Sequence, residues 1–246
     1  MTRPDAGIAA GATLVVTHEG QRATLVALDC DALVEWAASN DAVITMETVI
    51  GGSLAPGAPI MSVTGADRPV AERLLRSVVL DDERNIEQDP AYAIRLLVDV
   101  AIKALSPAIN DPTTAVQALD QIEDLLVALQ QRPLGGLHFT DGSGASRLVV
   151  PGPDWQQYLQ LATTEIRHFG ADSIQVDRRL LAMLDRLATQ ATGPVTLLPI
   201  LEQKERVREL ATLSFPSLDD QREAQVADAL GLGAVLTPPR PSGAPE

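Results

Sequence analysis

The residues best suited to chemistry in this 246-residue chain stand together in one short stretch, "ALSPAINDPTTAVQALD" at positions 104–120. This stretch interrupts an apolar run with proline, asparagine, aspartate and threonine. Asn110, Asp111 and Thr114 combine a carboxylate with hydrogen-bond donors and acceptors, which a general base or a site for a polar ligand or an ion requires. We therefore take the stretch as the first candidate for a functional site.

A charged stripe precedes this stretch. Arg95, Asp99 and Lys103 follow one another at four-residue steps, which places them on one face of an otherwise apolar helix. Opposite charges at this spacing stabilise a helix by only about 0.2–0.5 kcal/mol, less than the burial of charges costs, so we expect this face to meet water or a cavity. A solvated helix face explains the same stripe, and no residue is assigned a catalytic role. The candidate ligand-binding residues are Arg84, Arg95, Asp99, Lys103, Asn110, Asp111 and Thr114.

A purely structural interpretation of the 104–120 stretch is also available. Asp111 followed by Pro112 is typical of a helix start, because the carboxylate accepts the free N–H groups of the first turn and proline has no N–H to leave unpaired. Asp89 and Pro90 repeat the same pair earlier in the chain. The stretch is thus either a polar site or a turn between two capped helices, and both interpretations stay open.

Other kinds of site receive little support from the sequence. The three histidines are far apart, and Cys30 is the single cysteine, so neither a thiolate zinc site nor an intramolecular disulfide can form. Oxygen ligands for Mg²⁺ or Ca²⁺ are available at Asp99, Asn110 and Asp111, but their spacing is not that of an EF-hand loop. Phosphate-binding loops and nucleophile elbows are not found either. No metal ligand is assigned, and the cofactor is unknown.

The composition limits the classes of partner. A net charge of −14 and an aromatic content of 3% argue against binding of nucleic acid, which needs basic patches and stacking side chains. No window of about 18 consecutive apolar residues occurs, so we expect no membrane span in this chain. The N-terminus makes a poor signal peptide, and we expect a cytoplasmic protein that is membrane-associated, if at all, through a partner.

The first part of the chain is rich in short β-branched segments separated by glycine and proline. A short helix is expected within 29–41, where Leu33, Trp36 and Ala37 recur at helical spacing. From Asp67 the spacing becomes helical, beginning with a helix that carries Leu74 and Val78 on its apolar face. The expected strands are 12–17, 23–29, 42–50 and 59–63.

The rest of the chain is predicted to be mainly helical, with a hairpin near 137–150 around an Asp-Gly-Ser-Gly turn. The helix over 90–105 is apolar around most of its circumference, which predicts a place at the centre of its domain. The fold class is therefore α+β, with a β-rich unit (1–66), a helical domain (67–236) interrupted by the hairpin, and a disordered tail (237–246). Further helices are expected from Pro112 to about residue 132 and over 154–169, 172–190, 197–213 and 218–230.

The run 83–126 resembles the central signature of the bacterial family called domain of unknown function 2254, whose members are predicted membrane proteins. A looser likeness extends over about residues 20–215. Members typically carry transmembrane helices before this region, so the resemblance implies that this chain corresponds to the soluble portion. It implies no activity. The residues that carry it are Arg84, Gln88, Asp89, Pro90, Asp99, Ser106, Pro107, Asn110, Asp111, Pro112, Thr114 and Asp120.

The resemblance favours a polar site, because helix caps alone would tolerate several residue types at positions where the pattern asks for particular ones. We expect a non-catalytic binding or regulatory domain that takes a small polar ligand or an ion at the helix–turn–helix. Self-association as a homo-oligomer and a membrane-protein partner are expected with it. The alternative is a hydrolase-type enzyme that uses Asp99 or Asp111 as general base in the same pocket, and a purely structural module is the third interpretation.

Overall fold

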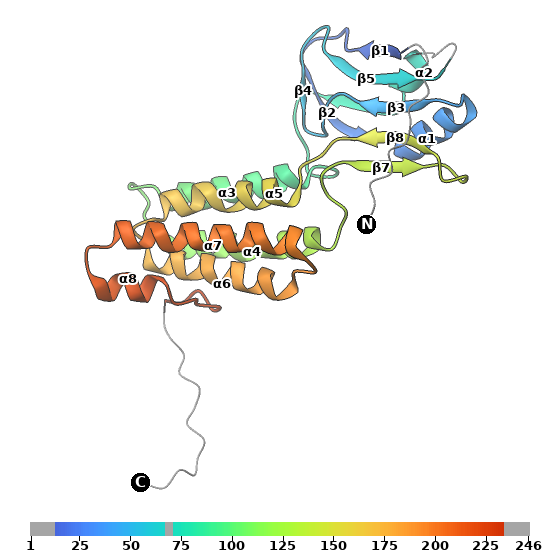
Figure 1. Cartoon of the computed structure of the whole chain (residues 1–246). Coiled ribbons are helices and arrows are strands. Elements are labelled where there is room, and N and C mark those ends of the chain that lie inside the picture. The colour runs from blue at the N-terminus through green and yellow to red at the C-terminus, as the bar shows by residue number, and fades with distance from the viewer. Residues whose placement is uncertain (1–12, 67–70, 234–246) are drawn as a thin grey trace, which may run out of the picture. The chain divides into compact units, whose positions relative to one another are not determined.

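The computed structural model describes residues 13–66 and 71–233, and it confirms the α+β fold class (Figure 1). The chain forms two compact units, each built from two stretches of sequence. The first unit comprises Met1–Ala93 and Arg132–Trp155, and the second comprises Ile94–Gln131 and Gln156–Glu246. The predicted disordered tail, 237–246, lies outside the described residues.

Within the described residues, the first unit contains two sheets together with the helices α1 and α2. The larger sheet has the strand order β1-β5-β3-β8-β7, and the smaller one has the order β4-β2-β6. All neighbouring strands are antiparallel except β3 and β8, which are parallel. The elements are β1 (Thr13–Thr17), β2 (Ala23–Leu28), α1 (Cys30–Ser39), β3 (Val43–Met46), β4 (Ser53–Leu54), β5 (Pro59–Thr64), α2 (Ala71–Leu75), β6 (Val78–Asp81), β7 (Leu137–Thr140) and β8 (Ser146–Val150).

The predicted helix between the second and third strands is confirmed as α1, which packs against β3, β7 and β8. Asp29 caps it, because its carboxylate accepts the backbone N–H of Ala32 at 3.0 Å. Leu33, Trp36 and Ala37 are buried, as their spacing predicts, in one core with the inward-facing residues of both sheets.

The hairpin β7–β8 lies in sequence between the two stretches that form the second, helical unit, and it belongs to the first unit. It completes the larger sheet of the first unit, where Ile44 pairs with Leu148 and Thr45 pairs with Val149. Leu148 and Val150 are buried in the core of that unit. Burial of this apolar face is the physical reason, since a two-stranded hairpin alone is only marginally stable.

The helix expected after Asp67 ends earlier than predicted, at Leu75. Its described part is Ala71–Leu75, and residues 67–70 lie outside the described part of the chain. Val78–Asp81 is instead strand β6, in which Val78 pairs with Leu28 of β2. The β-branched pair Val78-Val79 favours an extended backbone, and pairing with β2 outweighs the helical spacing of the leucines and valines.

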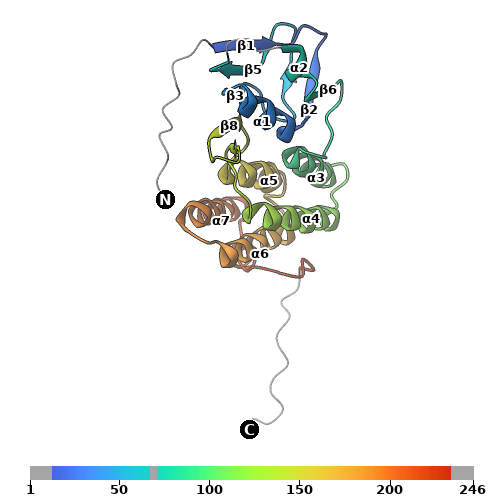
Figure 2. The same cartoon turned by 90° about the vertical axis from the view of Figure 1, so that its right-hand side faces the viewer.

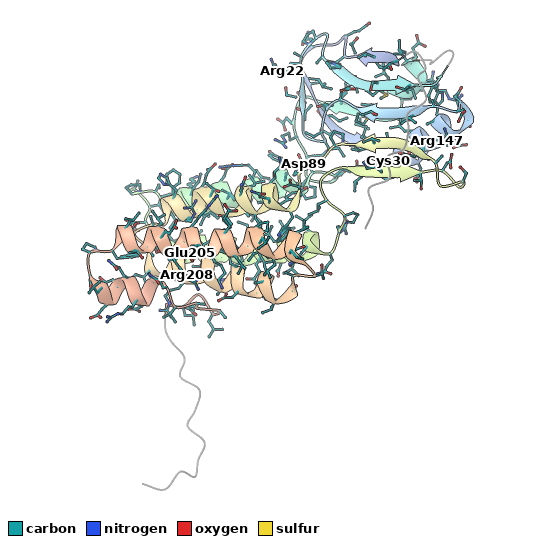
Figure 3. The ribbon with its side chains drawn as sticks, viewed as in Figure 1. Arg22, Cys30, Asp89, Arg147, Glu205 and Arg208 are labelled. Carbon is teal, nitrogen blue, oxygen red and sulfur yellow. The ribbon has the colours of Figure 1, made fainter. Side chains whose placement is uncertain are left out.

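An ion pair holds the end of this unit, just before α3 (Pro90–Ala104) begins. Arg84 donates to Asp89 Oδ2 from Nε at 3.2 Å and from Nη2 at 2.7 Å, while Asp89 Oδ1 accepts the N–H of Tyr92 at 3.0 Å. Asp89, labelled in Figure 3, is buried, and the Arg84 guanidinium also lies 5.0 Å from the ring centre of Tyr92. The predicted Asp-Pro helix start is thus confirmed, with Arg84 neutralising the capping carboxylate.

Gly51 supports this ion pair by leaving room for it. The residue has a φ of +82°, and a Cβ at this position would overlap Asp89 Oδ2 and the guanidinium of Arg84. Gly57 has the same φ of +82°, but a Cβ there would meet nothing within 4 Å. The two glycines therefore separate the cost of a left-handed backbone from the cost of a steric clash.

We expect Gly57→Ala to lower the free energy of unfolding by about 1–2 kcal/mol, the cost of a left-handed alanine. Gly51→Ala should cost about 1–3 kcal/mol more, because the new methyl group must push the Arg84 guanidinium away from the buried carboxylate of Asp89. Urea unfolding of both variants measures the difference. Equal losses of stability in the two variants would show that the Arg84–Asp89 ion pair can move aside without a cost in free energy.

The second unit is a bundle of helices, and Figure 2 looks nearly along their axes. α6 is its central element, since it packs against α4, α7 and α8. The predicted central helix, 90–105, is not central: α3 buries one stripe, while Leu96 and Val100 are 43% and 48% exposed. α3 therefore carries more apolar side chains than the neighbouring elements cover. Besides α3, the helices are α4 (Pro112–Gln130), α5 (Trp155–Phe169), α6 (Ile174–Gln190), α7 (Pro194–Ser214) and α8 (Leu218–Ala224).

Candidate functional site

The turn between α3 and α4 is organised by its own backbone. The N–H of Asn110 donates to Ser106 O and the N–H of Asp111 donates to Ala104 O, both at 2.9 Å. Asn110 has a φ of +49°, the left-handed conformation that asparagine tolerates better than most residues and that often ends a helix. Asn110 therefore has a conformational role, and its side chain is exposed.

Asp111 and Thr114 are brought together as the cap of α4. Asp111 Oδ1 accepts the N–H of Thr114 at 3.1 Å, and Oδ2 accepts the Thr114 hydroxyl at 2.5 Å. These two bonds, the hydroxyl first, hold the pKa of Asp111 below its usual value. Since a general base works best with a pKa near the working pH, Asp111 is poorly suited to that role at neutral pH.

Arg95 forms the third group, and its main partner was missed by the sequence reasoning. It binds Glu165 of α5 through two parallel bonds of 2.7 and 2.9 Å, and it also donates to Asp99 from Nε at 2.8 Å. The hydrogen bonds from Arg95 lower the pKa of Glu165. Two carboxylates thus share one guanidinium between α3 and α5.

The predicted ligand-binding residues therefore divide into separate local groups. Arg84 belongs to the first unit, where it binds Asp89. Lys103 is exposed on α3, one turn beyond Asp99. Glu165 gave no signal in the sequence, because only the packing of α5 beside α3 brings it to Arg95.

A second polar cluster, also missed, lies on the central helix. Asp177, Arg178 and Arg179 are consecutive on α6 and are 0%, 1% and 5% exposed. Val176 and Leu180 are four residues apart and share one helix face, so their spacing alone would place the three charges between them towards water. No signal in the sequence therefore revealed the cluster, because it is the packing of α4, α7 and α8 against α6 that buries it.

The two arginines are satisfied by different neighbours. Arg178 donates to the backbone oxygens of Val226 and Gly233, each at 3.0 Å. Arg179 binds Asp120 of α4 at 2.7 Å and also Glu123, a carboxylate that is itself buried. α6 is thereby joined to α4 and to the segment after α8.

Asp177 is in a different situation, because neither of its carboxylate oxygens has a hydrogen-bond partner among the described residues. Burial raises its pKa to about 8; the negative charge of Asp172 adds to this rise, and Arg167 opposes it. The Nε of Arg167 is likewise buried and without a hydrogen-bond partner in the described part of the chain. Burial without hydrogen-bond partners favours the neutral, protonated form of a carboxyl group.

The first unit holds a groove of about 580 Å³. Its walls come from β1, β5, α2 and β6, and its polar groups are Thr17, His18, Glu19 and Glu72. A ring nitrogen of His18 forms a 2.5 Å hydrogen bond with Gln21 O, which fixes the ring. The apolar lining residues are Leu14, Val15, Val16, Ile60, Ala71, Leu75, Val78 and Leu80.

The family model described as "Predicted membrane protein (DUF2254)" matches residues 3–186, which include the β-rich unit, the polar turn and most of α6. The chain belongs to the DUF2254 family. No solved structure matches it. Within residues 13–66 and 71–233, no helix combines the length and the apolar character that a membrane crossing requires.

Curated relatives of this DUF2254 chain are uncharacterised proteins of mycobacteria. One from Mycobacterium tuberculosis (strain CDC 1551) is 29% identical over 245 residues, covering 92% of this chain and 45% of the relative. One from Mycobacterium bovis has the same identity and coverage. The chain therefore spans less than half the length of these relatives.

Several of the DUF2254 signature residues named from the sequence have a hydrogen-bond or ion-pair partner in this structure. Arg84 binds Asp89, Asp111 binds Thr114, and Asp99 binds Arg95. Asp120, the last of the signature, binds Arg179 of α6. Most charged side chains of the signature thus fix how the helices begin and pack, which is a structural role established by named contacts.

The turn supplies a test of this role. Asn110→Gly should leave stability unchanged, whereas Asn110→Ala should cost about 1 kcal/mol, because alanine resists a positive φ. Asp111→Ala should lower the unfolding midpoint by about 2–4 °C through loss of the cap, with a smaller loss for Asp111→Asn. Differential scanning calorimetry measures all four. Equal effects of Gly and Ala at position 110 would contradict the conformational role of Asn110.

The buried charges of α6 supply a second test. Glu123→Gln should lower the free energy of unfolding by about 3 kcal/mol, because it leaves Arg179 buried without its closest charged partner. Asp120→Asn removes a contact with the same guanidinium, but the Asp120 side chain is 50% exposed, so the cost should stay below about 1 kcal/mol. Urea unfolding compares the two. A larger loss for Asp120→Asn would mean that the exposed carboxylate, rather than the buried one, neutralises Arg179.

Proposed function

We propose that this chain is a non-catalytic binding and regulatory module whose ligand enters the groove of the first unit. The single observation that carries the proposal is that groove of about 580 Å³, mainly apolar and edged by a few polar groups. Binding sites for small molecules are commonly 300–1,000 Å³ in volume, with apolar walls and few polar contacts. The groove fits this description better than the self-paired residues of the α3–α4 turn do.

The polar groups of the groove indicate the kind of ligand. Glu19 and Glu72 are exposed at its rim, and the chain as a whole carries a net charge of −14. Leu75 and Leu80 contribute to its apolar wall. We infer a ligand with an apolar body and a positively charged end, because an anionic end would be repelled by both carboxylates.

A polar ligand or ion at the helix–turn–helix is the second candidate. It rests on the two carboxylates that share Arg95, since the Asp99 side chain is 51% exposed and Lys103 lies one turn away on the same helix. A hydrolase-type enzyme remains the alternative at this place. It would depend on Asp99 as general base, because the lowered pKa of Asp111 disfavours that residue.

Self-association and a membrane-protein partner belong to the same proposal. Val195, Leu198 and Leu201 form an exposed apolar row on α7, which supports contact with another protein surface. The description of the family as predicted membrane proteins supports a membrane-protein partner. A cytoplasmic location is proposed on the basis of the single cysteine.

The ligand proposal is tested with octylamine and octanoate, which share an apolar tail and carry opposite charges. We expect octylamine to raise the unfolding midpoint and to bind in calorimetric titration, and octanoate to bind more weakly. Leu75→Trp should abolish octylamine binding, because the indole occupies the groove. Leu75→Met, which keeps a similar volume, should preserve it.

Charge variants complete the experiment. Glu72→Gln should weaken octylamine binding about two- to fivefold, which is the range for an exposed ion pair. Glu35→Gln makes the same change of charge on α1, away from the residues that line the groove, and should leave the affinity unchanged. Unaltered binding in Leu75→Trp would exclude the groove as the site. If both glutamate variants weakened octylamine binding equally, the preference for a cation would come from the net negative charge of the chain and not from Glu72.

A further inference from the structure

The carboxyl group of Asp177 has no structural explanation of the kind that accounts for its neighbours. It lies on the central helix of the second unit, is 0% exposed, and neither oxygen has a hydrogen-bond partner among the described residues. Arg178 and Arg179, the next two residues, are both paired. A buried polar group left without partners is uncommon, and it calls for a specific reason.

The charged groups around Asp177 come from the elements packed around α6. Arg167 near the end of α5 and Asp172 in the α5–α6 connection act on it directly. Arg206 and Glu209 of α7 act in turn on Arg167. Among the charged groups of α4 and α8, Asp120, Glu123 and Glu223 bind Arg179 or Arg178 instead.

We propose that Asp177 is a proton-binding site whose ionisation controls an ion pair with Arg167, and thereby a contact between α6 and α5. We call this ion pair the latch. In the protonated state the neutral carboxyl group is tolerated without a partner. When the proton is released to solvent, the carboxylate draws the guanidinium of Arg167 into an ion pair. Only the O–H bond of the carboxyl group breaks: its electron pair stays on the oxygen, the proton goes to water, and the buried charge of −1 that appears is matched by the existing +1 of Arg167.

The cost of burying a charge supplies the driving force. An ionised carboxylate in an apolar interior is strongly disfavoured unless a cation and hydrogen-bond donors reach it. Arg167 can supply both, because its Nε is already buried near Asp177 without a hydrogen-bond partner of its own. Burial and, after it, the positive charge of Arg206 disfavour the charged form of Arg167, and an ionised Asp177 beside it would offset both effects.

The connection between the helices confines the movement to the side chain. Gly170 follows α5 directly, and a Cβ there would lie 2.6 Å from Val176 Cγ1 and 2.9 Å from Ile166 O. This turn therefore has no spare room for the backbone. The long side chain of Arg167 is the part that can move, and its motion would change the surface at the end of α5.

The expected pH range follows from the direction of the shift. The pKa of Asp177 is raised by burial to about 8 in the folded chain, against 3.8 as the ordinary value. The folded state thus holds the proton more tightly than the unfolded state does. The stability that this tighter proton binding contributes is fully present when the pH is below the ordinary pKa of 3.8, and it is lost progressively as the pH rises towards 8.

The test uses the full chain labelled with ¹³C, in which NMR follows the Asp177 Cγ and Arg167 Cζ resonances across a pH titration. We expect both to titrate with one midpoint near 8. Asp177→Asn should abolish the titration of Arg167 Cζ. Arg167→Gln should raise the midpoint of Asp177, because it removes the cation that favours the charged form.

Stability provides an independent measurement if the resonances overlap. Relative to wild type, Asp177→Asn should become increasingly stabilising between about pH 4 and 8. Asp185→Asn is the matched control on the same helix, since Asp185 is half-exposed and pairs with Lys204, and it should lack this slope. A midpoint for Asp177 near 4 would overturn the proton site. A midpoint near 8 with no response of Arg167 would overturn the latch.

Discussion

The burial of three consecutive charges on α6 is the constraint on which the second unit depends. A helix turns about 100° per residue, so Asp177, Arg178 and Arg179 must each find a different environment around the same axis. Arg179 is met by carboxylates of α4, and Arg178 by backbone oxygens of the segment after α8. The positions of the surrounding helices are thus tied to charge neutralisation as well as to apolar packing, because an unpaired buried charge is far more costly than a lost apolar contact.

The acidic composition explains why cations are shared. With 33 acidic and 19 basic residues, several arginines serve two carboxylates at once. Arg95 binds Asp99 and Glu165, and Arg147, labelled in Figure 3, binds Asp41 and Asp141. An excess of carboxylates leaves some without a cation, and a buried one then avoids its charge by keeping a proton. Asp177 is a buried carboxyl group without a hydrogen-bond partner among the described residues, and its burial favours the protonated form.

Local patterns in the sequence predicted most of the elements, because capping residues and apolar spacing act over a few neighbours. Asp111 as a helix cap and Trp36 on a buried helix face are examples. The parallel pairing of Ile44 with Leu148 could not be predicted in this way, since about a hundred residues separate the strands and no turn links them directly. For the same reason Asp111 and Thr114 were predicted together, being three residues apart, whereas Glu165 escaped notice beside Arg95.

The distinction between a cap and a site depends on whether a polar group is satisfied by its own surroundings. Asp111 accepts two bonds from Thr114, and Asp89 is held by Arg84 and by the first turn of α3, so their geometry needs no ligand to complete it. Such groups stabilise a fold and gain nothing from further binding. Asp177 is the opposite case, because its oxygens are buried and have no hydrogen-bond partner among the described residues. Binding of a proton or a cation there would reduce the free-energy cost of burying the carboxylate. Among the described residues, we therefore expect a response to pH at Asp177, because its carboxyl oxygens are buried without hydrogen-bond partners.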